Sequence, residues 1–138
     1  MQIELFENER ITLQTRLDSE KTQADRNKLG QFATPANLAR DILRFGVELL
    51  GDRPPIRFID PAFGTGSFFS ALLHTVPEKR LEKAKAFEVD DHYGGPARAL
   101  WKDWGLDLEL ADFTQALAPA AEGDRFNLLI CNPPYVRH

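Results

Sequence analysis

Residues 56–67 read IRFIDPAFGTGS, and this stretch decides the fold. The apolar residues before Asp60 predict a short buried strand, and the apolar run at 68–73 predicts a helix beyond the glycine turn. Such a strand, turn and helix are typical of a parallel sheet covered by helices. The turn offers backbone N–H groups and the positive end of the helix dipole to a ligand. We therefore expect an α/β fold with a ligand site at the end of this strand.

The residues of the turn favour a ligand with a positive group over a pyrophosphate. A dinucleotide-binding turn would need a third glycine where Phe69 stands, and the turn has no Lys-Ser/Thr pair of the P-loop type. A carboxylate at Asp60 would repel a pyrophosphate but suits an ammonium group. Gly64 and Gly66 let such a ligand approach the backbone closely.

Acidic residues also follow the next two predicted strands. Residues 84–89 predict one strand, and Glu88 lies 22 residues after Gly66. At that distance an acidic residue accepts hydrogen bonds from a ribose diol, although a surface charge is the alternative. Residues 106–111 alternate Leu with acidic residues, as a half-buried or edge strand does, and end at Asp112-Phe113. This pair either contacts a purine or forms a helix cap and a core aromatic residue.

Helices are predicted in four further segments. Residues 4–27 carry a thin apolar stripe and predict a helical arm. A solvated arm is the favoured interpretation, and contact with DNA is the alternative. Residues 28–35, KLGQFATP, predict a helix start with Thr34 as N-cap and Pro35 in the first turn. The preceding loop either only starts this helix or also covers a ligand. The remaining expectations are an apolar helix face of Leu38, Ile42, Phe45 and Leu49, a helix from about Pro96 to Trp104 packed through Ala99, Leu100 and Trp101, and a short helix at 114–118.

Residues 126–135 read FNLLICNPPY and predict a strand that stops abruptly. The apolar run is typical of a strand buried on both faces. Pro133 and Pro134 have no N–H, so the strand ends at Asn132. A side-chain amide, two carbonyls and an aromatic ring then project from one rigid corner, which suits a flat ring that carries an amine.

Composition limits the class of protein. The 138 residues are 43% hydrophobic and 28% charged, which indicates one globular domain that is short for a complete α/β enzyme. A net charge of −4 argues against binding nucleic acid mainly through phosphates. The sequence shows no secretory signal or membrane span, so we expect a cytoplasmic protein. One cysteine excludes an internal disulfide, and the three histidines have no metal-ligand spacing.

Taken in order, the motifs at 30–35, 60–66, 88, 112–113 and 132–135 resemble those of DNA N6-adenine methyltransferases that use S-adenosylmethionine. The resemblance runs from residue 28 to 135 and is strongest to enzymes whose cofactor motifs precede the Asn-Pro-Pro-Tyr motif. It implies a partial Rossmann-like class I methyltransferase sheet of about four parallel strands in the order 3-2-1-4. It also implies a helical arm at 1–28 and a partial cofactor-binding domain at 29–138.

The resemblance implies a role for each site residue, and no metal. Thr34 would contact the methionine end of the cofactor, Asp60, Ala62, Gly64 and Gly66 its amino acid part, Glu88 its ribose, and Asp112 with Phe113 its adenine. Asn132 and the Pro133 carbonyl would accept hydrogen bonds from a target adenine flipped out of double-stranded DNA, and Tyr135 would stack on that base.

This sequence also departs from the family. Such enzymes build a seven-stranded sheet and a recognition domain, so we expect an N-terminal fragment of a restriction-modification or defence enzyme with little activity alone. The fourth strand would be an exposed edge open to self-association. Protein-glutamine and RNA methyltransferases share the Asn-Pro-Pro-Tyr motif and are alternatives. A non-catalytic module that binds cofactor or a partner is a third.

Overall fold

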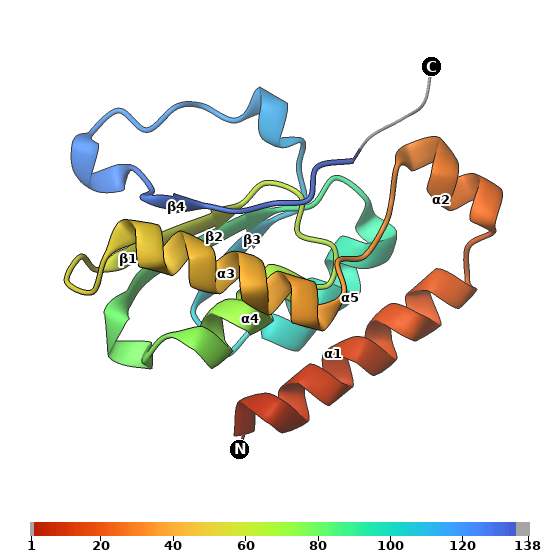
Figure 1. The fold of residues 1–138 in the computed structure, drawn as a ribbon. Helices are drawn as coiled ribbons and strands as arrows, with labels where there is room; N and C mark the ends of the chain where they lie inside the picture. The colour runs from red at the N-terminus through yellow and green to blue at the C-terminus, as the bar shows by residue number, and fades with distance from the viewer. Residues whose placement is uncertain (1, 135–138) are drawn as a thin grey trace.

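A four-stranded parallel sheet forms the centre of the computed structural model, which describes residues 2–134 (Figure 1). Its strands, in the spatial order β3-β2-β1-β4, are β1 (Ile56–Asp60), β2 (Leu81–Phe87), β3 (Leu106–Glu109) and β4 (Leu128–Leu129). All pairings between them are parallel. The predicted α/β fold and strand order are therefore confirmed.

The helices are α1 (Gln2–Ser19), α2 (Gln23–Leu29), α3 (Ala36–Leu50), α4 (Ser67–Thr75) and α5 (Asp91–Trp101), with single 3-10 turns at Glu78–Arg80, Phe113–Gln115 and Glu122–Asp124. The short helix predicted at 114–118 is only one of these turns. Helices α1, α3, α4 and α5 lie on one side of the sheet in Figure 1, α2 lies beyond its end, and the segment between β3 and β4 passes on the other side. Among residues 2–134, no helix has the length and apolar character needed to cross a bilayer.

Helix α5 begins five residues before the predicted start at Pro96, because the Asp90 side chain caps it by accepting the His92 N–H at 2.9 Å. Trp101 near its end is buried, and its ring meets Phe69 of α4 edge-on at 5.1 Å between centroids. Ala97 is also buried, whereas Ala99 is exposed, so the predicted contact of Ala99 with the sheet is wrong.

Helix α3 buries a different face from the predicted one. The row Leu38, Ile42, Phe45 and Leu49 is 36–72% exposed. The row one position later, which includes Ala39, Leu43 and Gly46, packs against α4 and β4. Its small residues explain the choice, because a Cβ added at Gly46 would lie only 3.1 Å from the Leu128 and Ile130 side chains. Close approach of α3 to β4 therefore requires the smaller face.

Helix α1 is not a solvated arm. Glu7, Arg10 and Leu17 are buried, and α1 packs against α4 and α5. The Phe6 ring lies 4.9 Å from Trp101 and 4.8 Å from Trp104 between centroids. The expected exposure of this region was wrong for α1, and a domain boundary at residue 28 stays a prediction.

Strand β4 is covered on one face only. Leu128 is 6% exposed, whereas its neighbour Leu129 is 58% exposed, so the predicted burial on both faces is wrong. Within the described part of the chain β4 pairs with β1 alone, at an edge of the sheet. Self-association through this edge stays a prediction.

Candidate functional site

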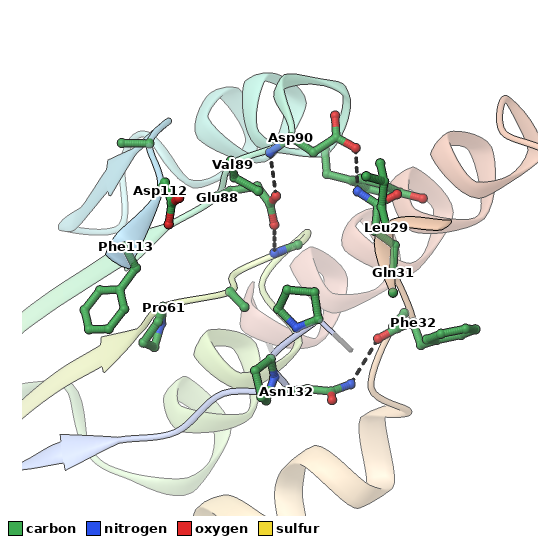
Figure 2. A pocket seen from close by; sticks show the side chains of 18 of the residues that line it. Leu29, Gln31, Phe32, Pro61, Glu88, Val89, Asp90, Asp112, Phe113 and Asn132 are labelled. Atoms are coloured by element: carbon green, nitrogen blue, oxygen red, sulfur yellow. Dashed lines mark hydrogen bonds between the residues drawn. The ribbon is translucent and has the colours of Figure 1, made fainter. Parts of the chain in front are cut away.

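A cavity of about 520 Å³ opens where the strands end (Figure 2). It is lined by side chains from α1, by the segment 29–33 and by the residues that follow β1, β2, β3 and β4. Seven of the predicted site residues line it: Ala62, Gly64, Glu88, Asp112, Phe113, Asn132 and Pro133. Thr34, Asp60 and Gly66 do not line it, and Tyr135 lies outside the described residues.

The two glycines of the turn have different tasks. Both adopt left-handed backbone conformations, with φ of 60° at Gly64 and 100° at Gly66. A Cβ at Gly66 would lie 2.6 Å from Phe63 and Trp101 ring atoms, so packing requires this glycine. A Cβ at Gly64 would meet nothing within 4 Å, because this residue borders the cavity.

Three backbone N–H groups of the glycine turn already donate hydrogen bonds within the protein. The Ala62 N–H donates to Asp60 Oδ1 at 3.0 Å, the Gly64 N–H to Glu88 Oε1 at 2.8 Å and the Gly66 N–H to the Phe63 carbonyl at 3.0 Å. The expectation that the turn offers its N–H groups to a ligand is therefore wrong at these three positions. A ligand must be recognised mainly by the carboxylates around the turn.

Asp60 is fully buried behind Pro61 and Ala62, which line the cavity. Its Oδ1 accepts the Ala62 N–H, but its Oδ2 is buried with no hydrogen-bond partner among the described residues. The pKa of Asp60 is raised to about 7, mainly by burial and also by the charge of Glu88, and the Ala62 hydrogen bond opposes this shift. A buried oxygen of this kind carries a desolvation cost that a cationic group would offset.

Glu88 is a fixed part of the cavity wall and not a surface charge. It is 9% exposed, and its two carboxylate oxygens accept the N–H groups of Gly64 and Asp90, each at 2.8 Å (Figure 2). Burial raises the pKa of Glu88, although both hydrogen bonds oppose this effect. Each oxygen retains a further lone pair that a hydroxyl group of a ligand can use.

Asp112 acts as a cap, one of the two expected alternatives. Its Oδ1 accepts the Thr114 N–H at 2.9 Å and the Thr114 hydroxyl at 2.7 Å, and these hydrogen bonds lower the pKa of Asp112. Phe113 is not a core residue, because it is 38% exposed and lines the cavity. Its ring is held edge-on to Phe87 at 5.4 Å between centroids, which leaves it positioned beside the cavity.

Asn132 is oriented by the segment that precedes α3. Its Nδ2 donates to the Phe32 carbonyl at 3.1 Å (Figure 2). It also donates to Thr34 Oγ1 at 3.3 Å. Thr34 is therefore not the predicted helix cap; Pro35 holds that position, and its side chain makes no capping hydrogen bond. Both amide hydrogens of Asn132 are engaged in this way, so Oδ1 is the atom left to accept from a ligand.

Several cavity residues were not predicted from the sequence: Gln14, Asp18, Asp90 and Tyr93. Gln31 belongs to the loop at 29–33, which lines the cavity as one of the two expected alternatives. Asp90 joins three segments, since it accepts from Lys21, from Gln31 Nε2 at 2.5 Å and from the His92 N–H at 2.9 Å. The position of Asp90 in the acidic run after β2 was the sequence signal that could have identified it. Asp18, Glu88, Asp90 and Asp112 together give the lining an acidic character that suits a positively charged ligand. Within residues 2–134, no group of three or more His, Cys, Asp or Glu side chains is placed to bind a metal.

The chain is similar in sequence to two proteins that are named as methyltransferases. It is 30% identical over 113 residues to Type II methyltransferase M.AccI of Acinetobacter calcoaceticus, covering 81% of this chain and 19% of that enzyme. It is 26% identical over 125 residues to Modification methylase CviBIII of Paramecium bursaria Chlorella virus NC1A, covering 89% of this chain and 31% of that enzyme. No protein-family model matches the chain.

Solved structures share the fold. The type I restriction-modification methyltransferase subunit of Streptococcus thermophilus superposes with a TM-score of 0.60 and 21% identity, over 75% of this chain and 23% of that one. A Pyrococcus horikoshii protein proposed to be an RNA methyltransferase superposes with a TM-score of 0.61 and 22% identity. The match covers 89% of this chain and 59% of that one. The chain spans less than a third of the length of the two sequence relatives. It is similar in sequence to these two methyltransferases over part of their length and has the class I methyltransferase fold.

Proposed function

We propose that this chain is the cofactor-binding and catalytic-motif part of an enzyme that methylates the N6 amine of adenine in DNA. The observation that carries the proposal is the position of Asn132. This residue lines the same cavity as Glu88 and Phe113, and its amide is held so that Oδ1 remains as an acceptor. An amine acceptor and the residues expected to bind a cofactor therefore border one space.

The cavity fits S-adenosylmethionine as the methyl donor. This molecule carries an ammonium group and a sulfonium group, and the lining residues Asp18, Glu88 and Asp112 are acidic. The buried, unpartnered Oδ2 of Asp60 favours a cationic group beside Ala62. Under the proposal Asp60 and the surface formed by Ala62 and Gly64 hold the amino acid part, and Gly66 shapes the turn from behind. Glu88 accepts from the ribose, and Asp112 and Phe113 contact the adenine. Bound S-adenosylmethionine supplies an electrophilic methyl carbon.

The residues at the end of β4 would activate the target amine. The lone pair of the adenine N6 is delocalised into the ring, so the nitrogen is a weak nucleophile. Acceptors at Asn132 Oδ1 and the Pro133 carbonyl would hold both N–H bonds and favour the pyramidal, positively charged nitrogen that forms during transfer. Thr34 and the Phe32 carbonyl keep the Asn132 amide in the required orientation. Tyr135 would stack on the flipped base, which offsets roughly 1–3 kcal/mol of lost base stacking.

The test separates binding from transfer. Calorimetry with S-adenosylmethionine and S-adenosylhomocysteine should show binding to the 138-residue chain, and Asn132→Ala should retain that binding. The complete natural polypeptide that contains the chain is then incubated with methyl-labelled cofactor and duplex DNA, structured RNA or a glutamine-containing protein.

Label in N6-methyladenine of DNA, lost in Asn132→Ala, is the expected result. Label confined to RNA or protein would assign the chain to one of the alternative methyltransferases. Cofactor binding without transfer to any of the three would point to a non-catalytic module.

A further inference from the structure

A polar network connects α1 to the back of the glycine turn. Arg10 is 3% exposed and pairs with Glu7 through two hydrogen bonds, Nε to Oε2 at 2.8 Å and Nη2 to Oε1 at 2.6 Å. Its remaining nitrogen, Nη1, donates to Thr65 Oγ1 at 3.2 Å and to Ser67 Oγ at 3.1 Å. The guanidinium group thus reaches both sides of Gly66 from a helix more than fifty residues earlier in the chain.

The direction of each hydrogen bond follows from the donors. Arg10 only donates, so the Thr65 hydroxyl accepts from it and gives its own hydrogen to Gln14 Oε1 at 2.6 Å. The Gln14 amide group then donates through Nε2 to Asp18 Oδ1 at 3.0 Å, which also accepts the Tyr93 hydroxyl at 2.7 Å. One continuous chain of bonds therefore runs from α1 through the turn to α5.

Burying an ion pair here contributes little net stability compared with an apolar contact, because desolvation of Arg10 and Glu7 offsets their attraction. Such a network instead selects one geometry for the groups it contacts. Here the contacted group is Thr65, between the two glycines with left-handed backbones. Gln14 and Asp18 of the same network also line the cavity.

We propose that α1 is a positioning element of the cofactor site, holding the glycine turn in its ligand-binding conformation through Arg10, Thr65 and Gln14. The part concerning ligand affinity rests on the proposed function. The effect of α1 on the conformation of the glycine turn can be measured in the protein without ligand. By reciprocity, ligand bound against the turn favours docking of α1.

The central variant is Thr65→Val, which removes the hydroxyl group and keeps the shape of the side chain. Thr65→Ser restores the hydroxyl group, and Thr12→Val makes the same chemical change on the exposed side of α1. Gln14→Met breaks the Thr65 contact from α1 at a half-buried position, so it tests the same bond without altering the core. Hydrogen exchange of the Gly64 and Gly66 amides is measured in the free protein, and S-adenosylhomocysteine affinity by calorimetry.

Thr65→Val and Gln14→Met should each accelerate exchange at Gly64 and Gly66 roughly tenfold relative to β1 and β2 amides, and weaken ligand binding roughly tenfold. Thr65→Ser and Thr12→Val should stay within about twofold of the starting protein. Unchanged exchange at the turn, faster exchange throughout the sheet, or failure of serine to restore the turn would each overturn the proposal. A starting protein that binds no S-adenosylhomocysteine would overturn the proposed function, while the exchange data would still decide the role of α1.

Discussion

Replacing Glu88 by alanine tests the wall of the cavity most directly. The carboxylate accepts two backbone N–H groups, from Gly64 and Asp90, and no other side chain among the described residues accepts from either. Glu88→Ala therefore removes a support of the glycine turn together with the proposed ribose acceptor. The two losses appear in different measurements.

Hydrogen bonds to a charged acceptor contribute about 1.5–3 kcal/mol each, but burial of this carboxylate has a cost, as its raised pKa shows. We expect a total loss of about 1.5–3 kcal/mol in the free energy of unfolding. Loss of ribose hydrogen bonds of the same strength should weaken cofactor binding roughly tenfold to 150-fold. Glu88→Gln keeps the shape but points an NH₂ group at one of the two N–H donors, so intermediate losses are expected.

Urea unfolding measures the first quantity, and calorimetry with S-adenosylhomocysteine well below the unfolding temperature measures the second. Glu82→Ala is the matched control, because Glu82 lies on β2, the strand that Glu88 follows, with its side chain 53% exposed. Lower stability with unchanged ligand affinity would refute the ribose assignment and leave Glu88 a structural role. Unchanged stability would refute the hydrogen-bond account of the turn.

Asp60 and helix α3 give separate predictions. The folded protein keeps the Asp60 proton up to a pKa of about 7, whereas the unfolded chain loses it near pH 4, so stability falls as pH rises through this window. Asp60→Asn should flatten that slope, which urea unfolding at pH 5, 6 and 7.5 measures. Leu43→Ala should destabilise the protein by about 2–5 kcal/mol, and Leu49→Ala by less than about 0.5 kcal/mol. Equal losses in the two leucine variants would contradict the orientation of α3.

The parts of the site built from local sequence were predictable. The strand, glycine turn and helix at 56–75 follow from turn chemistry and apolar runs that lie next to one another in the chain. Parallel strands place their carboxyl ends at one edge, so Glu88, Asp112 and Asn132 were expected to meet at the cavity. Their hydrogen-bond partners were not predictable, because Gly64 and Thr34 contact them across 24 and 98 residues.

The wrong predictions for the buried faces of α3 and α1 have a common physical origin, because the partners of each face lie far away in the sequence. On α3, the row with Leu38 and the row with Ala39 have the same spacing, and packing against α4 and against Leu128 and Ile130 decides which row is buried. Apolar content favours the larger row, but close packing selects the smaller one.

On α1, the docked face carries Glu7, Arg10, Gln14 and Leu17, which recur at helical spacing yet are mostly polar. A hydrophobic pattern therefore cannot identify this face. The pair Glu7 and Arg10, three residues apart, was a readable signal, because opposite charges on one face neutralise each other before burial. The hydrogen-bond partners of this pair could not be predicted from the sequence, because Thr65 lies 55 residues from Arg10 and Ser70 lies 63 residues from Glu7. A thin apolar stripe thus indicates a solvated helix only where its charged residues are not paired with one another along one face.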